Sequence, residues 1–506
     1  MRVLSDEPGR LARSARLGFE VSAAFMLLAS CGGGGGSNTD PSTGLVASSS
    51  VAQHCAAPRS GSSDILGTVL DEKNWVRSWT DETYLWYQDV RALSASTLNA
   101  GNYATAIDYF DVLKSPQFTA SGKAKDHFHF VYDTPTWVAL SQSAVSYGYG
   151  FEIALIASTA PRQALVAYTS PGTPAATAGL ARGAQILTVD GVDLVYDNTQ
   201  AGIDTLNAGL FPDAAGTHTF TVLDPGASTP RSVQFTAAAL AQATVRNVKT
   251  LPAPNQTVGY MQFNDHLATS EAELVNAINQ LKASGVTDLM LDLRYNGGGY
   301  LDVASELAYM IAGPTPTNGQ VFERLTFNDK NPFQRTAEQS VTPFHASALG
   351  FSVARGTALP TLNLPRVFVL VGAGTCSASE AIVNGLRGVG VQVNLIGATT
   401  CGKPYGFYPQ DNCGTTYFSI QFRGVNQLGQ GDYADGFIPT CAASDDFTHA
   451  LGDPAEGRLA AALSYRANGV CAPAMAQAQG LRPSAALAGP TLVRPPLREN
   501  RIYRQR

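Results

Sequence analysis

The stretch Leu291–Gly299, LDLRYNGGG, decides the fold of this chain. It completes an apolar run, 287–293, which predicts a buried strand, and the run breaks directly into a glycine turn. Three consecutive glycines allow backbone N–H groups to approach a bound molecule without obstruction by side chains. We therefore expect a strand followed at once by a turn that can bind a ligand through its backbone.

Strand-like and helix-like patterns alternate on both sides of this stretch, from 258 to about 465. The strand patterns lie at 258–263, 287–293, 367–371 and 393–397, and the helical patterns lie at 270–283, 304–311 and 378–386. Such alternation predicts an α/β core.

A second informative stretch, Thr375–Glu380 (TCSASE), follows the strand pattern 367–371 and opens the helical pattern 378–386. This position puts Ser377 at the N-terminus of a helix, where backbone N–H groups and the helix dipole favour a developing negative charge. A serine at a helix start that faces a glycine turn has the parts needed for acyl transfer.

These motifs resemble the core motifs of the tail-specific, or C-terminal processing, serine peptidases of family S41. The resemblance covers roughly 74–462 and rests on Asp292–Gly299, on Ser377–Glu380 and on Thr400–Lys403 (TCGK). It implies a multidomain α+β protein with a ClpP/crotonase-like spiral α/β catalytic domain. The implied domains are a helical N-terminal domain at 64–135, a PDZ-like β-domain at 140–245 and the catalytic domain at 246–470.

The resemblance also implies roles for individual residues. Ser377 would be the nucleophile and Lys403 its base, which requires a neutral amine favoured by burial and a nearby helix N-terminus. The implied oxyanion donors are the backbone N–H groups of Gly298 and Ala378, and the implied supporting residues are Glu380 and Thr400. No cofactor or metal is implied.

The chain departs from the family pattern on both sides of Gly402-Lys403, and other residues could carry the chemistry. Cys401 replaces the usual aromatic residue and Pro404 replaces the usual glycine. Cys376 is intrinsically a stronger nucleophile than serine, although an exported protein would more readily use it in a disulfide. His127 or His129 could supply an imidazole base, as a histidine does in the tricorn branch of the family.

The PDZ-like segment contains the turn Tyr149-Gly150-Phe151 just before a strand pattern, 152–157. A glycine turn beside an open strand edge can offer backbone N–H groups to the terminal carboxylate of a peptide, and the peptide can then extend the sheet. We therefore expect peptide binding at these residues. The alternative is a β-domain with an ordinary glycine turn.

The N-terminus has the pattern of a bacterial lipoprotein signal. Arginines precede a short apolar stretch, 17–29, which predicts a signal peptide over 1–30 rather than a membrane span. Cys31 follows Leu-Ala-Ser, as in a lipobox, and would be the acylated residue. Residues 31–63 would form a flexible tether, and 471–506 would form a disordered basic tail.

Cysteine content and composition limit the remaining possibilities. Six of the seven cysteines remain once Cys31 is set aside, and an exported protein would use them in disulfides. Cys401 and Cys413 flank a turn-rich stretch and are the preferred pair. The spacing of the cysteines does not resemble a zinc site, and a net charge of -6 gives no reason to expect a nucleic-acid partner.

The sequence thus predicts a serine endopeptidase of the bacterial cell envelope, lipid-anchored and facing the periplasm or the exterior. Its substrates would be unstructured polypeptides gathered by the PDZ-like domain. The alternative from another class is a catalytically inactive lipoprotein that only binds peptides. An acyl-CoA enzyme of the crotonase type is a more distant alternative, since export separates the protein from coenzyme A.

Overall fold

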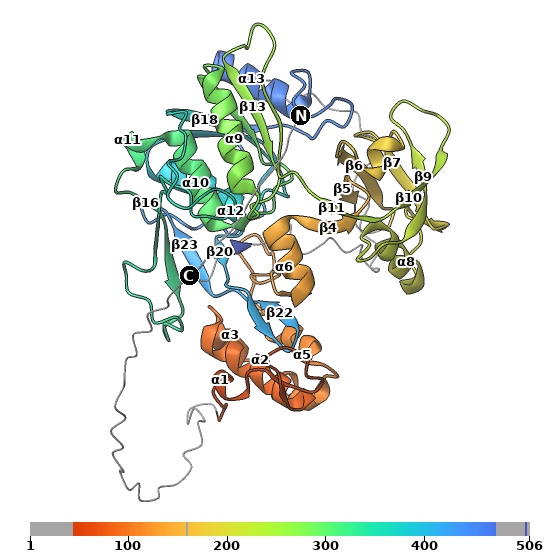
Figure 1. Ribbon diagram of the computed structural model, residues 1–506, viewed down its shortest axis with the longest axis vertical. Helices are drawn as coiled ribbons and strands as arrows, with labels where there is room; N and C mark the ends of the chain where they lie inside the picture. The colour runs from red at the N-terminus through yellow and green to blue at the C-terminus, as the bar shows by residue number, and fades with distance from the viewer. Residues whose placement is uncertain (1–43, 158–159, 472–500, 503–506) are drawn as a thin grey trace, which may run out of the picture. The chain divides into compact units, whose positions relative to one another are not determined.

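A computed structural model describes residues 44–157 and 160–471, together with the backbone of 501–502 (Figure 1). The predicted signal peptide and Cys31 lie outside the described residues. Among the helices of the described part, none is both long and apolar enough to cross a lipid bilayer.

The core of the fold is a six-stranded sheet in the order β12-β13-β14-β18-β19-β24. Its strands are β12 (Val245–Thr250), β13 (Val258–Phe263), β14 (Asp288–Asp292), β18 (Arg366–Val371), β19 (Gln392–Gly397) and β24 (Cys441–Ala442). From β13 to β24 neighbouring strands are parallel, and β12 runs antiparallel at one edge. Every residue of β13 and β14 is buried, which explains why both read as continuous apolar runs.

Helices cover both faces of this sheet. One face packs against α9 (Ser270–Ala283), α10 (Leu301–Ala312) and α12 (Ala378–Gly388), and the other packs against α13 (Gly457–Asn468). Alternate strand residues divide between the two faces: Leu291 of β14 belongs to the first core cluster and Met290 to the second. The predicted mixed α/β architecture is therefore confirmed.

The N-terminal part is mainly helical, and a small sheet joins it to the C-terminal half of the chain. Its helices are α2 (Val69–Thr83), α3 (Tyr87–Arg91), α4 (Ala95–Leu98) and α5 (Ala106–Val112). Trp75 and Trp79 stack on α2 with ring centroids 5.3 Å apart, and both pack against Tyr417. Tyr417 belongs to β22 (Thr415–Phe418), which pairs with β3 (Phe130–Asp133) and with β21 (Gln410–Asn412).

The predicted flexible tether over 31–63 is wrong for its second half. Helix α1 (Ser48–Val51) and strand β1 (His54–Cys55) lie there, and β1 pairs with β2 (Ile65–Leu66). The N–H of Gln53 donates to Asn412 Oδ1 at 2.7 Å, and a disulfide joins Cys55 to Cys413. These contacts with the distant β21–β22 hairpin hold the segment in place, and nothing in its local composition predicts them.

The segment 145–241 forms its own sheet and core. The strand order is β10-β9-β7-β6-β5, with β8 beside β7, and the strands are β5 (Phe151–Ala157), β6 (Gln163–Thr169), β7 (Gln185–Val189), β8 (Val192–Asp193), β9 (Thr217–Leu223) and β10 (Arg231–Thr236). Two short helices, α7 (Pro174–Thr177) and α8 (Gln200–Leu210), accompany it. A two-stranded antiparallel ribbon connects this segment to the rest of the chain. It consists of β4 (Val145–Gly148), which follows helix α6 (Thr134–Ser143), and β11 (Ala238–Ala241).

Two smaller sheets complete the described structure. One has the order β17-β16-β23-β20 and contains β16 (Val321–Phe327), β17 (Val341–Pro343), β20 (Tyr405–Gly406) and β23 (Phe422–Val425). The other pairs β15 (Gly299–Tyr300) in parallel with β25 (Arg501–Ile502). The expected disordered tail over 471–506 therefore includes a short strand, and Cys471 is tied to Cys441 by a disulfide.

Candidate active site

Ser377 lies in a sharp turn between β18 and α12. Its backbone has φ 60° and ψ -113°, a region that residues other than glycine rarely adopt, and its side chain is fully buried. The N–H of Ala378 is the first of helix α12 and has no hydrogen-bond acceptor within the described part of the chain. A buried N–H next to a serine at a helix start can stabilise a nearby negative charge.

The glycine turn and the serine turn meet through Asn296. The backbone carbonyl of Asn296 accepts from the N–H of Cys376 and from the hydroxyl of Ser379, each at 3.1 Å. The hydroxyl of Thr375, the residue before Cys376, donates to the carbonyl of Leu293 at 2.8 Å. The structure thus brings together the two stretches on which the acyl-transfer prediction depends.

Gly298 differs from the expected oxyanion donor in one respect. Its φ is 109°, and its N–H donates to Asn296 Oδ1 at 2.9 Å, so this donor is already engaged. An asparagine side chain readily accepts a hydrogen bond from the backbone N–H two residues later in the chain. The sequence of the motif does not show whether this hydrogen bond forms. The same Oδ1 lies 3.1 Å from Nδ1 of the buried His266, a residue that the sequence analysis missed.

The only sequence signal for His266 is its position shortly after the buried strand β13. Parallel strands end at the same edge of a sheet, so side chains that follow β13 and β14 meet there. The N–H of His266 also donates to the carbonyl of Gly298 at 3.0 Å, and the N–H of Tyr300 donates to the carbonyl of His266 at 2.8 Å. His266 therefore helps to shape the glycine turn.

Glu380 joins the serine turn to the lysine loop. Its fully buried carboxylate accepts from the N–H of Ser377 at 2.9 Å and from the N–H of Lys403 at 2.8 Å. It also accepts from the hydroxyl of Thr400 at 2.6 Å and from the N–H of Gly402 at 2.9 Å. Burial raises the pKa of Glu380 above its ordinary value, against the opposing effect of these four hydrogen bonds.

Lys403 is fully buried, and aromatic rings face its amino group. Nζ lies 4.5 Å from the ring centroid of Phe128 and 4.4 Å from that of Phe407. Gly402 has φ 89°, and a Cβ there would lie 2.2 Å from the carbonyl oxygen of Ala434, so this position requires glycine. Neither aromatic residue was identified from the sequence, because each approaches Lys403 only in the folded chain.

The segment Asp126–His129 contributes the Phe128 ring to the surroundings of Lys403, and its two histidines have contacts of their own. His127 is exposed, and its Nδ1 contacts the carbonyl of Ala124 at 2.9 Å. His129 faces Asp126, with Nδ1 2.8 Å from Oδ2. The burial that would raise the pKa of Asp126 is outweighed by His129 and by hydrogen bonds, so its pKa lies below the ordinary value.

A disulfide joins the residue before Ser377 to the lysine loop. It links Cys376 to Cys401 with a Cα–Cα distance of 5.2 Å, while Cys413 bonds to Cys55. The predicted Cys401–Cys413 pair is therefore wrong. Cys401 and Cys413 are close in sequence, but the parallel pairing of β18 with β19 brings the ends of these two strands together. Cys376 and Cys401, which follow the two strands, therefore bond to each other. Because Cys376 is bonded, it is not available as a thiol nucleophile.

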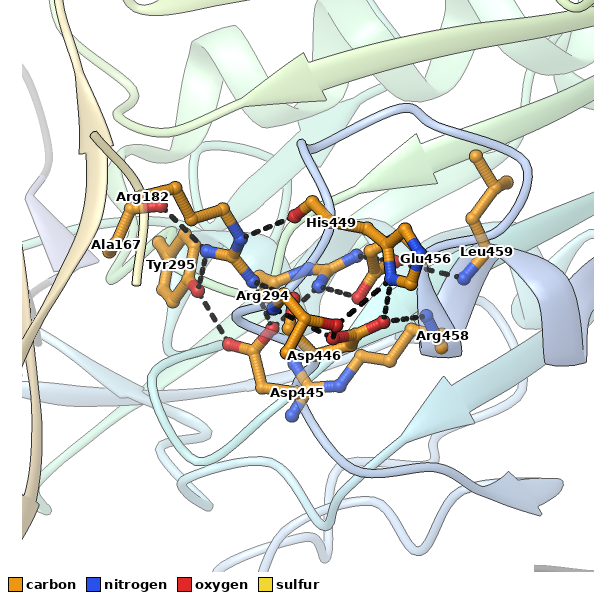
Figure 2. A network of polar contacts seen from close by, with 12 residues as sticks. Ala167, Arg182, Arg294, Tyr295, Asp445, Asp446, His449, Glu456, Arg458 and Leu459 are labelled. Atoms are coloured by element: carbon orange, nitrogen blue, oxygen red, sulfur yellow. Dashed lines mark hydrogen bonds and ion pairs between the residues drawn. The ribbon is translucent and has the colours of Figure 1, made fainter. Parts of the chain in front are cut away.

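Arg294 organises a buried ionic network behind the glycine turn (Figure 2). Its guanidinium donates to Asp292 at 2.9 Å, to Asp445 at 2.7 Å and to Glu456 at 2.6 and 2.9 Å. Burial alone would raise the pKa of Asp445, but the charge of Arg294 and its neighbours holds this pKa well below the usual range. Arg294 therefore supports the turn from behind.

The same network receives Arg182, which follows α7 in the segment 145–241. Figure 2 shows the guanidinium groups of Arg182 and Arg294 converging on Asp445. Arg182 donates to Asp445 Oδ1 at 2.6 Å and to the hydroxyl of Tyr295 at 2.8 Å, and the Tyr295 hydroxyl donates to Asp445 Oδ2 at 2.5 Å. No sequence pattern indicated this contact.

The residues expected to bind a peptide lie at the start of β5. The rings of Tyr149 and Phe151 stack with centroids 5.6 Å apart, and the Tyr149 hydroxyl donates to the carbonyl of Gly209 at 2.7 Å. Gly150 has φ 85°, and a Cβ there would lie 2.2 Å from the side chain of Thr173. The Tyr149 ring is buried in the core of this segment, and the half-buried Phe151 ring packs against that core.

Comparison with known proteins adds to this geometry. Residues 257–407 match the model of peptidase family S41. A carboxyl-terminal-processing protease of Picosynechococcus sp. is 30% identical over 233 residues, which are 46% of this chain and 49% of that protein. The chloroplastic C-terminal processing peptidase of Tetradesmus obliquus is 28% identical over 253 residues, which are 47% of this chain and 48% of that protein. The chain spans about half the length of the curated relatives it matches.

A solved structure shows the same fold. A Bacteroides fragilis protein assigned as an S41 protease superposes with a TM-score of 0.58 at 24% identity, covering 78% of this chain and 97% of that one. The matched segment 257–407 contains the glycine turn, the serine turn and the lysine loop described above. Through this segment, the chain is similar to peptidase family S41.

Proposed function

We propose that this chain is a serine endopeptidase that cleaves unstructured polypeptides, with Ser377 as nucleophile and Lys403 as general base. The observation that carries the proposal is the buried Glu380 carboxylate, which accepts hydrogen bonds from the backbone N–H groups of both residues. One side chain thereby fixes the two reactive residues relative to each other. The match of residues 257–407 to the model of peptidase family S41 supports the same assignment.

In this mechanism Ser377 Oγ attacks the scissile carbonyl while its proton passes to the Lys403 amine. Burial removes the hydration that an ammonium group needs, which favours the neutral amine before attack. Once the proton is transferred, the faces of Phe128 and Phe407 attract the new cation. The proton then goes to the leaving amine, and water hydrolyses the acyl-enzyme.

The oxyanion of the tetrahedral intermediate is assigned to the N–H of Ala378, which starts α12 and has no acceptor in the described structure. Gly298 can add a second donor only if its hydrogen bond to the Asn296 side chain is released. Extended substrate is assigned to the edge at Gly299–Tyr300. There the backbone of β25 already pairs in parallel, which supports strand addition at this position.

The proposal includes substrate capture by the segment 145–241, acting as a PDZ-like domain. Strand β5 lies at one edge of its sheet, the position at which a peptide strand can extend a sheet. Gly150 at the start of this edge would offer its backbone to a terminal carboxylate. Amidation of the C-terminus of a substrate should then slow its cleavage, and equal rates for the amidated and free-acid forms would exclude carboxylate capture.

We also propose lipid attachment at Cys31 and a location in the bacterial cell envelope. The support is the lipobox-like sequence alone, since this residue lies outside the described part of the chain. Cys31→Ser should release the protein from the membrane fraction, because acylation needs the thiol. Continued sedimentation of the variant with membranes would contradict the anchor.

The dyad is tested by replacing Lys403 with alanine and, separately, with arginine. Both variants should lose at least about 100-fold in casein cleavage, because alanine lacks a base and arginine stays charged. Wild-type activity should rise with pH as the amine loses its proton. Lys73→Ala is the matched control, because Lys73 is also buried but bonds to the carbonyl of Ala100 in the helical part.

Two outcomes would change the assignment. Full activity of Lys403→Ala together with loss in His127→Ala would move the base to the helical part. A wild-type protein that neither cleaves casein nor reacts with a fluorophosphonate at Ser377 would favour the inactive peptide-binding alternative.

A further inference from the structure

We propose that the Cys376–Cys401 disulfide is a positioning element of the peptidase site and makes its activity sensitive to thiol reduction. This inference rests on the proposed Ser377 and Lys403 dyad. Cys376 directly precedes Ser377, and Cys401 precedes Lys403 by one glycine. The bond therefore joins the two catalytic segments covalently, next to the residues that must react with each other.

The disulfide closes a clamp that hydrogen bonds also help to form. The N–H of Cys401 donates to the carbonyl of Thr375 at 3.0 Å, and the N–H of Cys376 donates to the carbonyl of Asn296 at 3.1 Å. Glu380 completes the clamp from the helix side, through the N–H groups of Ser377 and Lys403. Within this arrangement only the disulfide is covalent, so it alone keeps the two segments together when hydrogen bonds open transiently.

Ser377 needs such a constraint because of its backbone conformation. A non-glycine residue at φ 60° and ψ -113° is strained and persists only where the surroundings enforce it. Its chain neighbour Cys376 is fully buried and covalently attached to the lysine loop. The disulfide therefore resists relaxation of the turn on the side opposite to α12.

The pairing also explains a departure from the family pattern. Cys401 replaces the aromatic residue that usually precedes Gly-Lys, and Cys376 directly precedes the serine. In this chain a covalent bond occupies this position. Placement of Lys403 then depends on a bond that can be broken chemically.

Reduction requires an external dithiol, which can reach the partly exposed Cys401. A thiolate of the dithiol attacks the Cys401 sulfur, the S–S bond breaks and the Cys376 sulfur leaves and takes a proton. The second thiol of the reagent then closes its own disulfide and releases the Cys401 thiol. In total, two electrons and two protons pass from the dithiol to the protein.

The test compares two double variants with similar loops. Cys376→Ser/Cys401→Ser removes a bond that spans 25 residues in sequence, and Cys441→Ser/Cys471→Ser removes one that spans 30. The stabilisation expected from loop closure depends on the logarithm of loop length, so both variants should lose similar thermal stability. Cys441 lies in β24 at the sheet edge and takes no part in the proposed site.

With casein as substrate, we expect kcat of the Cys376/Cys401 variant to fall by at least about 10-fold with KM within about 2-fold, because the reacting groups lose alignment while substrate binding persists. Fluorophosphonate labelling of Ser377 should slow by a similar factor. The Cys441/Cys471 variant should keep the wild-type kcat and labelling rate.

A second measurement avoids dependence on the folding of a variant. Wild-type protein titrated with dithiothreitol should lose activity as Cys376 and Cys401 become alkylatable, and should regain it on reoxidation. Equal kcat in the two double variants, or full activity after both thiols are alkylated, would overturn the positioning role while leaving the dyad intact. A wild type that is inactive and unlabelled at Ser377 would overturn both proposals.

Discussion

Glu380 and Arg294 are both fully buried near the carboxyl ends of the central strands. Their surroundings compensate the desolvation of the buried charged group in different ways. The donors to Glu380 are three backbone N–H groups and one hydroxyl, from Ser377, Thr400, Gly402 and Lys403. Arg294 is surrounded by carboxylates, with Asp292, Asp445 and Glu456 in direct contact. The first arrangement uses hydrogen bonds to fix backbone positions, and the second uses compensating charges.

The difference corresponds to two tasks. Glu380 bonds the backbone of the residues proposed to react, so it sets their geometry directly. Within the described part of the chain, the hydrogen bonds of the Arg294 side chain go to carboxylates outside the serine turn and the lysine loop. They connect β14 to the start of α13 and to the loop that carries Asp445. We therefore expect loss of Arg294 to affect mainly stability, and loss of Glu380 to affect activity more than stability.

The largest effect on stability should come from Arg294→Met. This change removes one cation from contact with several buried carboxylates, which typically costs about 3–5 kcal/mol in the free energy of unfolding. Arg366→Met is the control, because Arg366 is 40% exposed and its partner Asp288 keeps a second arginine, Arg466. Its expected cost is below about 1 kcal/mol. Urea unfolding followed by fluorescence measures both, and equal costs would remove the basis for calling the Arg294 network a charge-compensated support.

A smaller effect on stability, with a large one on activity, should come from Glu380→Gln. The amide retains one acceptor oxygen but presents an NH₂ group to donors, so it leaves buried N–H groups unpaired at a cost of about 1–3 kcal/mol. We expect casein cleavage to fall at least about 10-fold, because Ser377 and Lys403 lose their common acceptor.

The control for Glu380 is Glu273→Gln. The Glu273 carboxylate also accepts from two backbone N–H groups, those of Thr244 and Val245, each at 2.8 Å, but it lies on α9 outside the proposed site. This variant should lose stability and keep its cleavage rate. If both glutamine variants cleave casein at the wild-type rate, Glu380 is a structural group only.

A further effect, on the order of 1 kcal/mol per pH unit and therefore small over any single pH step, concerns a third kind of buried carboxylate. Burial, together with the charge of neighbouring Glu271, raises the pKa of Glu306 from 4.5 to about 9. The folded protein therefore holds a proton that the unfolded chain releases above pH 4.5. The stability contributed by this proton is complete below that pH and is lost as the pH rises towards 9.

Glu306→Gln should remove this part of the pH dependence, because an amide does not titrate. Relative to the wild type, the variant should gain stability steadily between pH 5 and 9, as followed by the urea midpoint at each pH. If the difference in urea midpoint between wild type and variant stays constant over this range, Glu306 does not carry the extra proton. The comparison would then be limited to the arrangements around Glu380 and Arg294.

Local sequence patterns predicted the elements that position the site. The strand β13 and the helix α9 have the predicted bounds, and β14, β18 and α12 agree within a few residues. These elements are readable because apolar periodicity and glycine turns act over a few neighbouring residues. The positions of Ser377 at a helix start and of the glycine turn after β14 follow from the same signals.

Contacts between distant segments were decided only by the tertiary structure. Phe128 faces Lys403, Cys376 bonds Cys401 rather than leaving Cys401 to Cys413, and the Gly298 N–H is engaged by Asn296. The first two depend on which segments meet at the carboxyl edge of the parallel sheet, and the third depends on one side-chain rotation. Sequence alone determined which residues could react, because residue type and periodicity are local properties. The packing of the sheet determined which of these residues lie side by side, because their positions depend on contacts across the whole chain.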